Sequence, residues 1–161
     1  MNYRITHYSD ENRSTQWTSY WDLVKNNNFE TGFNIYKQTE NKYVRIFQKL
    51  LEDNCIKTMK IIELEDYSKN EKWNEKLFEK ELYDKLNLKN NAEYPIEEIM
   101  QIIKLCLREI LWCKIVFKTV YIHIGYDLYT YIGGIKKVDS EFIENELKNG
   151  ITIEEFESPY L

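Results

Sequence analysis

Residues 111–134 read LWCKIVFKTVYIHIGYDLYTYIGG and decide the fold class. The stretch contains three short runs rich in β-branched and aromatic residues, which Lys118–Thr119 and Gly125–Asp127 separate. Runs of this kind, divided by turn residues, are typical of consecutive strands in an antiparallel sheet. We therefore expect the centre of the sheet to consist of strands over residues 111–117, 120–126 and 128–132.

Amphipathic patterns before this block predict the helices that cover the sheet. From about Asn34 to Asp53, apolar residues recur at helical spacing opposite a charged face. Pro95 followed by acidic residues is typical of a helix start, because proline fixes φ and carboxylates favour the positive end of the helix dipole. This second helix should run to about Glu109 and is apolar over much of its surface, so we expect it to be the central buried helix.

Weaker patterns predict the remaining elements on either side. Apolar residues recur at helical spacing over residues 68–89, which predicts a surface helix. The aromatic residues of Trp17–Leu23 indicate a structural loop that its rings hold down. Alternation predicts three further strands, over residues 3–8, 59–64 and 151–156.

Turn and capping residues predict how the last quarter is divided. Gly133–Gly134 should form a turn, and Asp139 or Ser140 can cap a short helix that Gly150 ends with a positive φ. Helices and strands are mixed without regular βαβ alternation. The sequence therefore predicts a single α+β domain over residues 1–161, with a central, mostly antiparallel sheet packed against several helices.

Composition restricts the class of protein. Hydrophobic residues make up 43% of the chain and charged residues 30%, which predicts a folded domain with its own core. Three cysteines in no paired spacing favour free thiols in a reducing compartment. Neither a signal peptide nor an apolar run of membrane-spanning length is present. We expect a cytoplasmic protein with no membrane contact.

Few side chains could support catalysis. The chain has two histidines, His7 and His123, and we expect a hydrogen-bonded structural role for His123. Cys113 and His123 could form a nucleophile and its activating base if they met on adjacent strands. Cys106, Cys113 and His123 lack the paired spacing of a zinc site, and no glycine motif for phosphate binding occurs. The sequence thus predicts no catalytic residue, metal or cofactor, with an enzyme of unrecognised type as an alternative.

Charge is concentrated near the carboxyl end. Residues 1–120 contain 19 acidic and 19 basic side chains, whereas residues 121–161 contain 8 acidic and 3 basic ones. The net charge of −5 disfavours direct nucleic-acid binding, which requires a basic excess. The acidic last quarter is either a solvated face or a docking surface for a basic partner.

Several segments spread over nearly the whole chain carry a family likeness. They are Trp17–Tyr20, the helix that contains Tyr43, Leu107–Glu109 with Trp112–Lys114, His123–Ile132 and Glu154–Tyr160. Together they resemble small bacterial immunity proteins of contact-dependent growth inhibition and other polymorphic toxin systems. The resemblance implies a cytoplasmic protein that binds the C-terminal domain of a cognate toxin, often a nuclease, and blocks it.

Charge supports the same kind of partner independently, because a nuclease has a basic cleft that an acidic surface can occupy. Tyrosines would act as rigid anchors, and carboxylates would set the association rate and register. A regulatory or structural module that binds a host component is the alternative. The candidate partner-binding residues are Asp127, Tyr129, Tyr131, Asp139, Glu141, Glu144, Glu154, Glu155 and Glu157.

Overall fold

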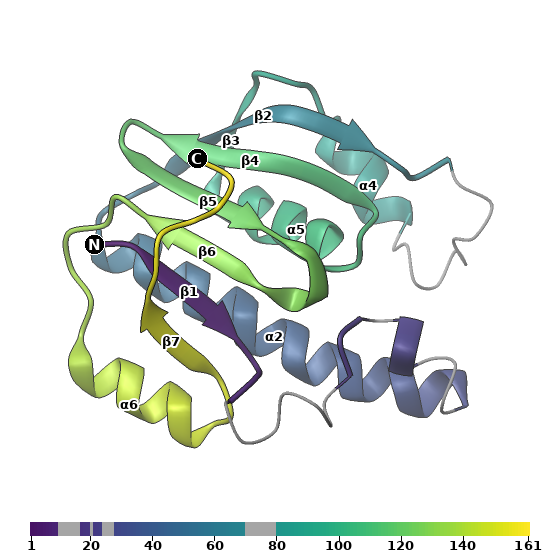
Figure 1. The fold of residues 1–161 in the computed structure, drawn as a ribbon. Coiled ribbons are helices and arrows are strands. Elements are labelled where there is room, and N and C mark those ends of the chain that lie inside the picture. The colour runs from purple at the N-terminus through teal and green to yellow at the C-terminus, as the bar shows by residue number, and fades with distance from the viewer. Residues whose placement is uncertain (10–16, 20, 24–27, 70–79) are drawn as a thin grey trace.

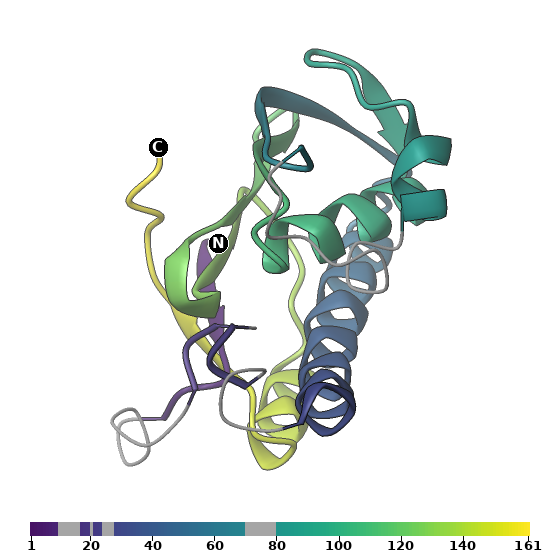
Figure 2. The ribbon, with the colours of Figure 1, turned by 90° about the vertical axis from the view of Figure 1, so that its right-hand side faces the viewer.

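The computed structural model describes residues 1–9, 17–19, 21–23, 28–69 and 80–161, which form a seven-stranded sheet with helices on one face (Figures 1 and 2). The strands are β1 (Tyr3–Thr6), β2 (Thr58–Asp66), β3 (Glu93–Pro95), β4 (Leu111–Phe117), β5 (Val120–Ile124), β6 (Thr130–Gly133) and β7 (Thr152–Glu155). The helices are α2 (Phe29–Asp53), α4 (Lys80–Leu86), α5 (Ile96–Leu107), α6 (Ser140–Lys148) and the 3-10 helix η1 (Tyr126–Leu128), and residues 21–23 of the predicted aromatic loop are also helical. The strand order is β3-β2-β4-β5-β6-β1-β7 with every neighbouring pair antiparallel, which confirms the predicted α+β class.

The block that decides the fold forms the middle of this sheet. β4 pairs with β5 and β5 pairs with β6, so the three predicted strands are consecutive neighbours. Lys118 turns the chain between β4 and β5 with a φ of 54°. Between β5 and β6, the turn η1 places Asp127 at a φ of 56°. The first turn therefore falls where the sequence places it, whereas η1 includes Leu128 and β6 begins at Thr130, two residues later than predicted.

Boundaries within the block differ from the prediction. β5 ends at Ile124, because the Gly125 amide donates to the Tyr129 carbonyl at 2.7 Å and turns the chain earlier than expected. β6 includes Gly133, so the chain leaves the strand only at Gly134, whose φ is +73°. The predicted glycine turn is thus correct in kind but begins one residue later.

Helix α2 begins earlier than the apolar pattern indicates. The side chain of Asn28 accepts a hydrogen bond from the Thr31 amide at 2.9 Å and caps the helix, which starts at Phe29 and not at Asn34. Such a cap is strong because it satisfies one of the amides that the first helical turn leaves unpaired.

Among the described residues, no helix combines the length and apolarity that a membrane crossing requires.

The bounds and caps of the other helices match the prediction in part. α5 is the buried helix, with Pro95 at its N-cap, and it ends slightly before the predicted Glu109. Asp139 caps α6 by accepting from the Glu141 amide at 3.0 Å, and Gly150 follows α6 with a φ of 80°. Of the helix predicted over residues 68–89, the described part is α4, and residues 70–79 lie outside the described residues. The short strand β3 was not predicted.

A row of isoleucines crosses the sheet under the helices. Ile61 of β2, Ile115 of β4, Ile122 of β5 and Ile132 of β6 are register partners in turn, and all four are fully buried. Side chains of α2 and α5 complete the same hydrophobic core. Burying a side chain of this size stabilises the fold by about 1.5–3 kcal/mol, so this row is a main source of stability.

One ion pair is buried between α2 and the end of α5. Arg108 donates from Nε to Glu40 Oε1 at 2.6 Å and from Nη2 to Glu40 Oε2 at 2.8 Å. The two side chains are 2% and 0% exposed. Tyr36 lies beside Glu40. Burial raises the pKa of Tyr36, and the negative charge of Glu40 raises it further. Arg108 and Glu40 each supply the opposite charge that the other needs once it is removed from water.

Removing one member should therefore be costly. We expect Arg108→Met to lower the free energy of unfolding by about 3–5 kcal/mol, because the Glu40 carboxylate is left buried and unpaired. Urea unfolding measures this loss. The double variant Arg108→Met/Glu40→Met should recover most of it, whereas breaking the exposed Lys80–Asp84 pair with Lys80→Ala should cost about 1 kcal/mol or less. Equal losses from Arg108→Met and Lys80→Ala would contradict the account.

Candidate protein-binding site

The sheet face opposite the helices carries a polar and aromatic row. Successive side chains of a strand point to opposite faces, so the neighbours of the buried isoleucines point away from the helices. In register across six strands, this row consists of Ile62, Lys114, His123, Tyr131, Arg4 and Glu154. The helix-free face is thus chemically distinct from the core face.

The C-terminal residues 156–161 lie on this helix-free face, as Figure 2 shows. The Ser158 hydroxyl is 2.8 Å from Nδ1 of His123. The ring of Tyr160 meets the rings of His123 and Tyr131 edge-on, with centroid distances of 6.1 and 5.8 Å. This tail covers the centre of the face and leaves Tyr131 only 7% exposed.

The position of His123 makes it a structural residue. Its ring stacks on Tyr121 at a centroid distance of 4.7 Å. Burial, and then the charge of Lys114, lower the pKa of His123 to about 4, while Glu63 opposes them. The imidazole is therefore neutral at pH 7 and forms a hydrogen bond with the Ser158 hydroxyl.

The cysteines lie on the other side of the sheet. Lys114 is the register partner of His123, so the side chain of Cys113, one residue away, points to the opposite face. Cys113 is buried with its Sγ 3.7 Å from that of Cys106. Cys113 and His123 consequently do not form the nucleophile and base considered from the sequence. Among the residues described, no three His, Cys, Asp or Glu side chains gather as metal ligands.

Arg4 organises the end of the row next to the edge strand β7. Its Nε and Nη2 donate to Glu154 Oε1 at 2.8 and 2.5 Å. Its guanidinium also lies over the rings of Phe156 and Tyr129, at 4.3 and 5.3 Å from their centroids. This combination of ion pair and cation–π contacts fixes the start of the tail to β1. Glu154 therefore contributes little free negative charge to a partner.

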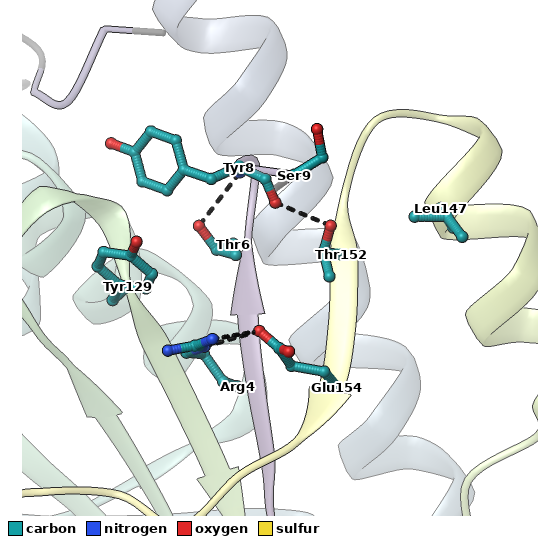
Figure 3. A pocket seen from close by; sticks show the side chains of 8 residues that line it. All are labelled: Arg4, Thr6, Tyr8, Ser9, Tyr129, Leu147, Thr152 and Glu154. Atoms are coloured by element: carbon teal, nitrogen blue, oxygen red, sulfur yellow. Dashed lines mark hydrogen bonds and ion pairs between the residues drawn. The ribbon is translucent and has the colours of Figure 1, made fainter. Parts of the chain in front are cut away.

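A cavity of about 220 Å³ opens beside this ion pair (Figure 3). Thr6 Oγ1 accepts from the Tyr8 amide at 3.3 Å, and Thr152 Oγ1 donates to the Tyr8 carbonyl at 2.9 Å. Hydroxyls and one neutralised ion pair suit hydrogen bonding to a polar side chain of a partner. The residues lining the cavity are Arg4, Thr6, Tyr8, Ser9, Tyr129, Leu147, Thr152 and Glu154.

Three of the nine predicted binding residues come together around Arg4. Tyr129 and Glu154 line the cavity, and Tyr131 is the register partner of Arg4. Tyr129 is half-buried and accessible from the cavity, whereas the tail covers Tyr131. Asp127 does not join them, because it lies exposed in the turn η1. The predicted set is therefore divided between separate parts of the surface.

The other predicted carboxylates lie at the start of α6, within α6, at the end of β7 and in the tail. We call α6, β7 and residues 156–157 the α6–β7 edge. Asp139 is used as the cap of α6, whereas Glu141 and Glu144, three residues apart, share one side of that helix. Glu155 and Glu157 are exposed at the end of β7 and in the tail. The carboxylates of this edge that form no ion pair with a described residue are Glu141, Glu144, Glu155 and Glu157.

Sequence reasoning missed the residues that act through distant partners. Arg4 is separated from Glu154 by 150 positions, and a lone arginine in a short alternating strand gives no sign of such a partner. Leu147 is not among the predicted binding residues, but it is exposed at the margin of the cavity. No local pattern marks the tail residues beyond Glu157 as contacts of the sheet. The Ser158 hydroxyl nevertheless fixes the C-terminus to His123.

Comparisons with known proteins found no match among protein-family models, characterised proteins or solved structures. Any role for this surface must therefore be argued from the residues of the chain itself.

Acid should weaken the tail contact through His123. Because its pKa in the folded protein lies below the ordinary value of 6.5, the unfolded chain binds the proton more readily. This contribution to stability is complete above pH 6.5 and is lost as the pH falls towards 4, by at most roughly 3 kcal/mol. Urea unfolding from pH 7.5 to 4.5 should therefore show a steeper loss for the natural chain than for His123→Gln. A constant difference between the two proteins across that range would contradict the assignment.

Proposed function

We propose that this chain is a cytoplasmic immunity protein that binds and blocks the C-terminal domain of a cognate toxin. The toxin domain is a basic protein, in the simplest case a nuclease, and it contacts the α6–β7 edge and the adjoining cavity. The observation that carries the proposal is the set of four exposed carboxylates on this edge that have no cationic partner among the described residues.

Unpaired carboxylates of this kind suit recognition of a basic protein. Other acidic residues of the last quarter are compensated, since Glu146 binds Arg45 and Glu154 binds Arg4. The charges left over attract a positive surface at long range and raise the association rate. An immunity protein benefits from this because it must capture its toxin before the toxin reaches its substrate.

Exposed apolar side chains on the same edge can supply affinity. Leu147 is 57% exposed and Phe156 is 42% exposed, so both can contact a partner. Apolar anchors surrounded by charged groups are a common arrangement of binding hot spots. The cavity beside Leu147 offers Tyr129 and several hydroxyls to a polar side chain.

The likeness of the chain to immunity proteins supports the same function. Two of its most specific segments, Gly125–Ile132 and Glu154–Pro159, lie in the turn, strand and tail that border this surface. Blocking a toxin requires a rigid surface and no chemistry, and the tail is tied to the sheet through His123 and Arg4.

Charge reversal on α6 tests the proposal. The partner is the candidate toxin domain from a reading frame adjacent to this gene, and the variant is Glu141→Lys/Glu144→Lys. We expect association at low salt to slow by roughly tenfold, and the difference from the natural chain to shrink at high salt, because salt screens exposed charges. Stopped-flow or surface-binding kinetics measure this rate, and growth of cells that express both proteins measures protection.

The matched control is Glu81→Lys/Glu97→Lys. These residues are also exposed glutamates on helices, so the change in net charge is the same. The control should associate almost as fast as the natural chain. The proposal fails if the natural chain neither rescues growth nor co-purifies with the toxin domain, and the α6–β7 edge is excluded if both variants behave alike.

A further inference from the structure

A second cavity lies beside the turn η1, away from the α6–β7 edge. Its volume is about 390 Å³, within the range of about 300–1,000 Å³ that ligand pockets occupy. Four aromatic side chains from different segments line it: Tyr67, Trp112, Tyr126 and Tyr160. We call this cavity the aromatic groove. Tyr126 is 77% exposed, so its ring offers most of its surface to an incoming group.

The tail and the turn form one wall of the aromatic groove together. A side chain at Gly125 would come within 2.7 Å of the Tyr160 hydroxyl, so only glycine permits this close approach. The Tyr160 ring in turn meets the Trp112 ring edge-on at 6.5 Å between centroids. The Trp112 and Tyr160 rings are therefore held in place by packing before any partner arrives.

Carboxylates supply the charge of the aromatic groove. Glu65 and Glu109 line it, and Asp127 follows Tyr126 directly. Tyr67 donates a hydrogen bond to Glu65, which leaves the other carboxylate oxygen available. Partial burial, and then the charges of Asp127 and Asp22, raise the pKa of the Glu109 carboxyl. None of the described residues that line the groove is positively charged.

We propose that the aromatic groove binds an arginine side chain of a partner protein. A guanidinium stacks on aromatic faces and directs its donors to carboxylates in its own plane, and the groove presents both kinds of group together. An arginine beside Glu109 would also compensate the negative charge that Asp127 and Asp22 place near that carboxyl. A lysine ammonium is a compact, strongly hydrated charge that gains less from ring stacking.

The inference does not depend on the toxin or on the α6–β7 edge. The two surfaces share no lining residue, so they can be tested with separate probes. If the proposed function is also correct, the aromatic groove would hold an arginine of the same toxin domain or of another partner.

The probe is the capped peptide Ac-Gly-Arg-Gly-NH2, titrated into the full, 15N-labelled chain. We expect saturable shifts of the Trp112 indole and Gly125 amide resonances, with a dissociation constant on the order of 1 mM for a single side chain. The same peptide with citrulline, which is neutral and nearly the same shape, should bind at least tenfold more weakly. The lysine peptide should bind several-fold more weakly than the arginine peptide.

Two variants locate the contact. Tyr126→Ala removes an exposed ring and Glu109→Gln removes one charge, and each should weaken arginine binding by roughly fivefold or more. The controls are Leu147→Ala, which removes an exposed apolar side chain of the other cavity, and Glu97→Gln, which removes an exposed charge from α5. Both controls should bind the peptide as the natural chain does. Unchanged urea midpoints will show that the variants are folded.

Several results would overturn the inference. Equal binding of the citrulline and arginine peptides would show that charge plays no part, and tighter binding of the lysine peptide would show that the site does not select a guanidinium. Shifts confined to the cavity beside Arg4, or full binding by both Tyr126→Ala and Glu109→Gln, would place the arginine elsewhere. None of these results bears on toxin binding at the α6–β7 edge.

Discussion

Burial of the isoleucine row determines what the rest of the sheet can do. Ile61, Ile115, Ile122 and Ile132 must face α2 and α5, because moving any strand by one residue would expose its isoleucine to water. Strand alternation then assigns the intervening residues to the other face. The polar and aromatic row, the tail that packs on it and both cavities follow from this one choice of register.

The protein carries two cavities of different chemistry, one beside the Arg4–Glu154 ion pair and one beside η1. At the first, Arg4 neutralises Glu154, and free carboxylates begin only at the α6–β7 edge. At the second, rings and carboxylates line the aromatic groove together, and the groove also reaches Cys106 of α5. Ser158 and Tyr160 hold the tail against the middle of the row. Neither side chain is charged, so they shape the surface without adding to the charge that attracts a partner.

Local sequence patterns predicted the elements well but not the contacts between distant residues. The strands of residues 111–134, the buried helix α5 and the Asp139 cap of α6 all have signals within a few residues. The buried Arg108–Glu40 pair and the Arg4–Glu154 pair join residues 68 and 150 positions apart, and no local pattern encodes them. For the same reason, the sequence identified Glu154 and Tyr131 as candidate contacts without revealing that Arg4 and the tail already occupy them.

Hydrogen exchange on the chain with and without the proposed toxin domain tests the central claim most directly, because it locates the contact without any substitution. The account predicts slower exchange on binding at η1, α6, β7 and the C-terminal tail, with little change in α2 and α5. Protection concentrated on the exposed residues of α2 and α5, or no complex at all, would contradict the claim that the helix-free face and its edge receive the partner.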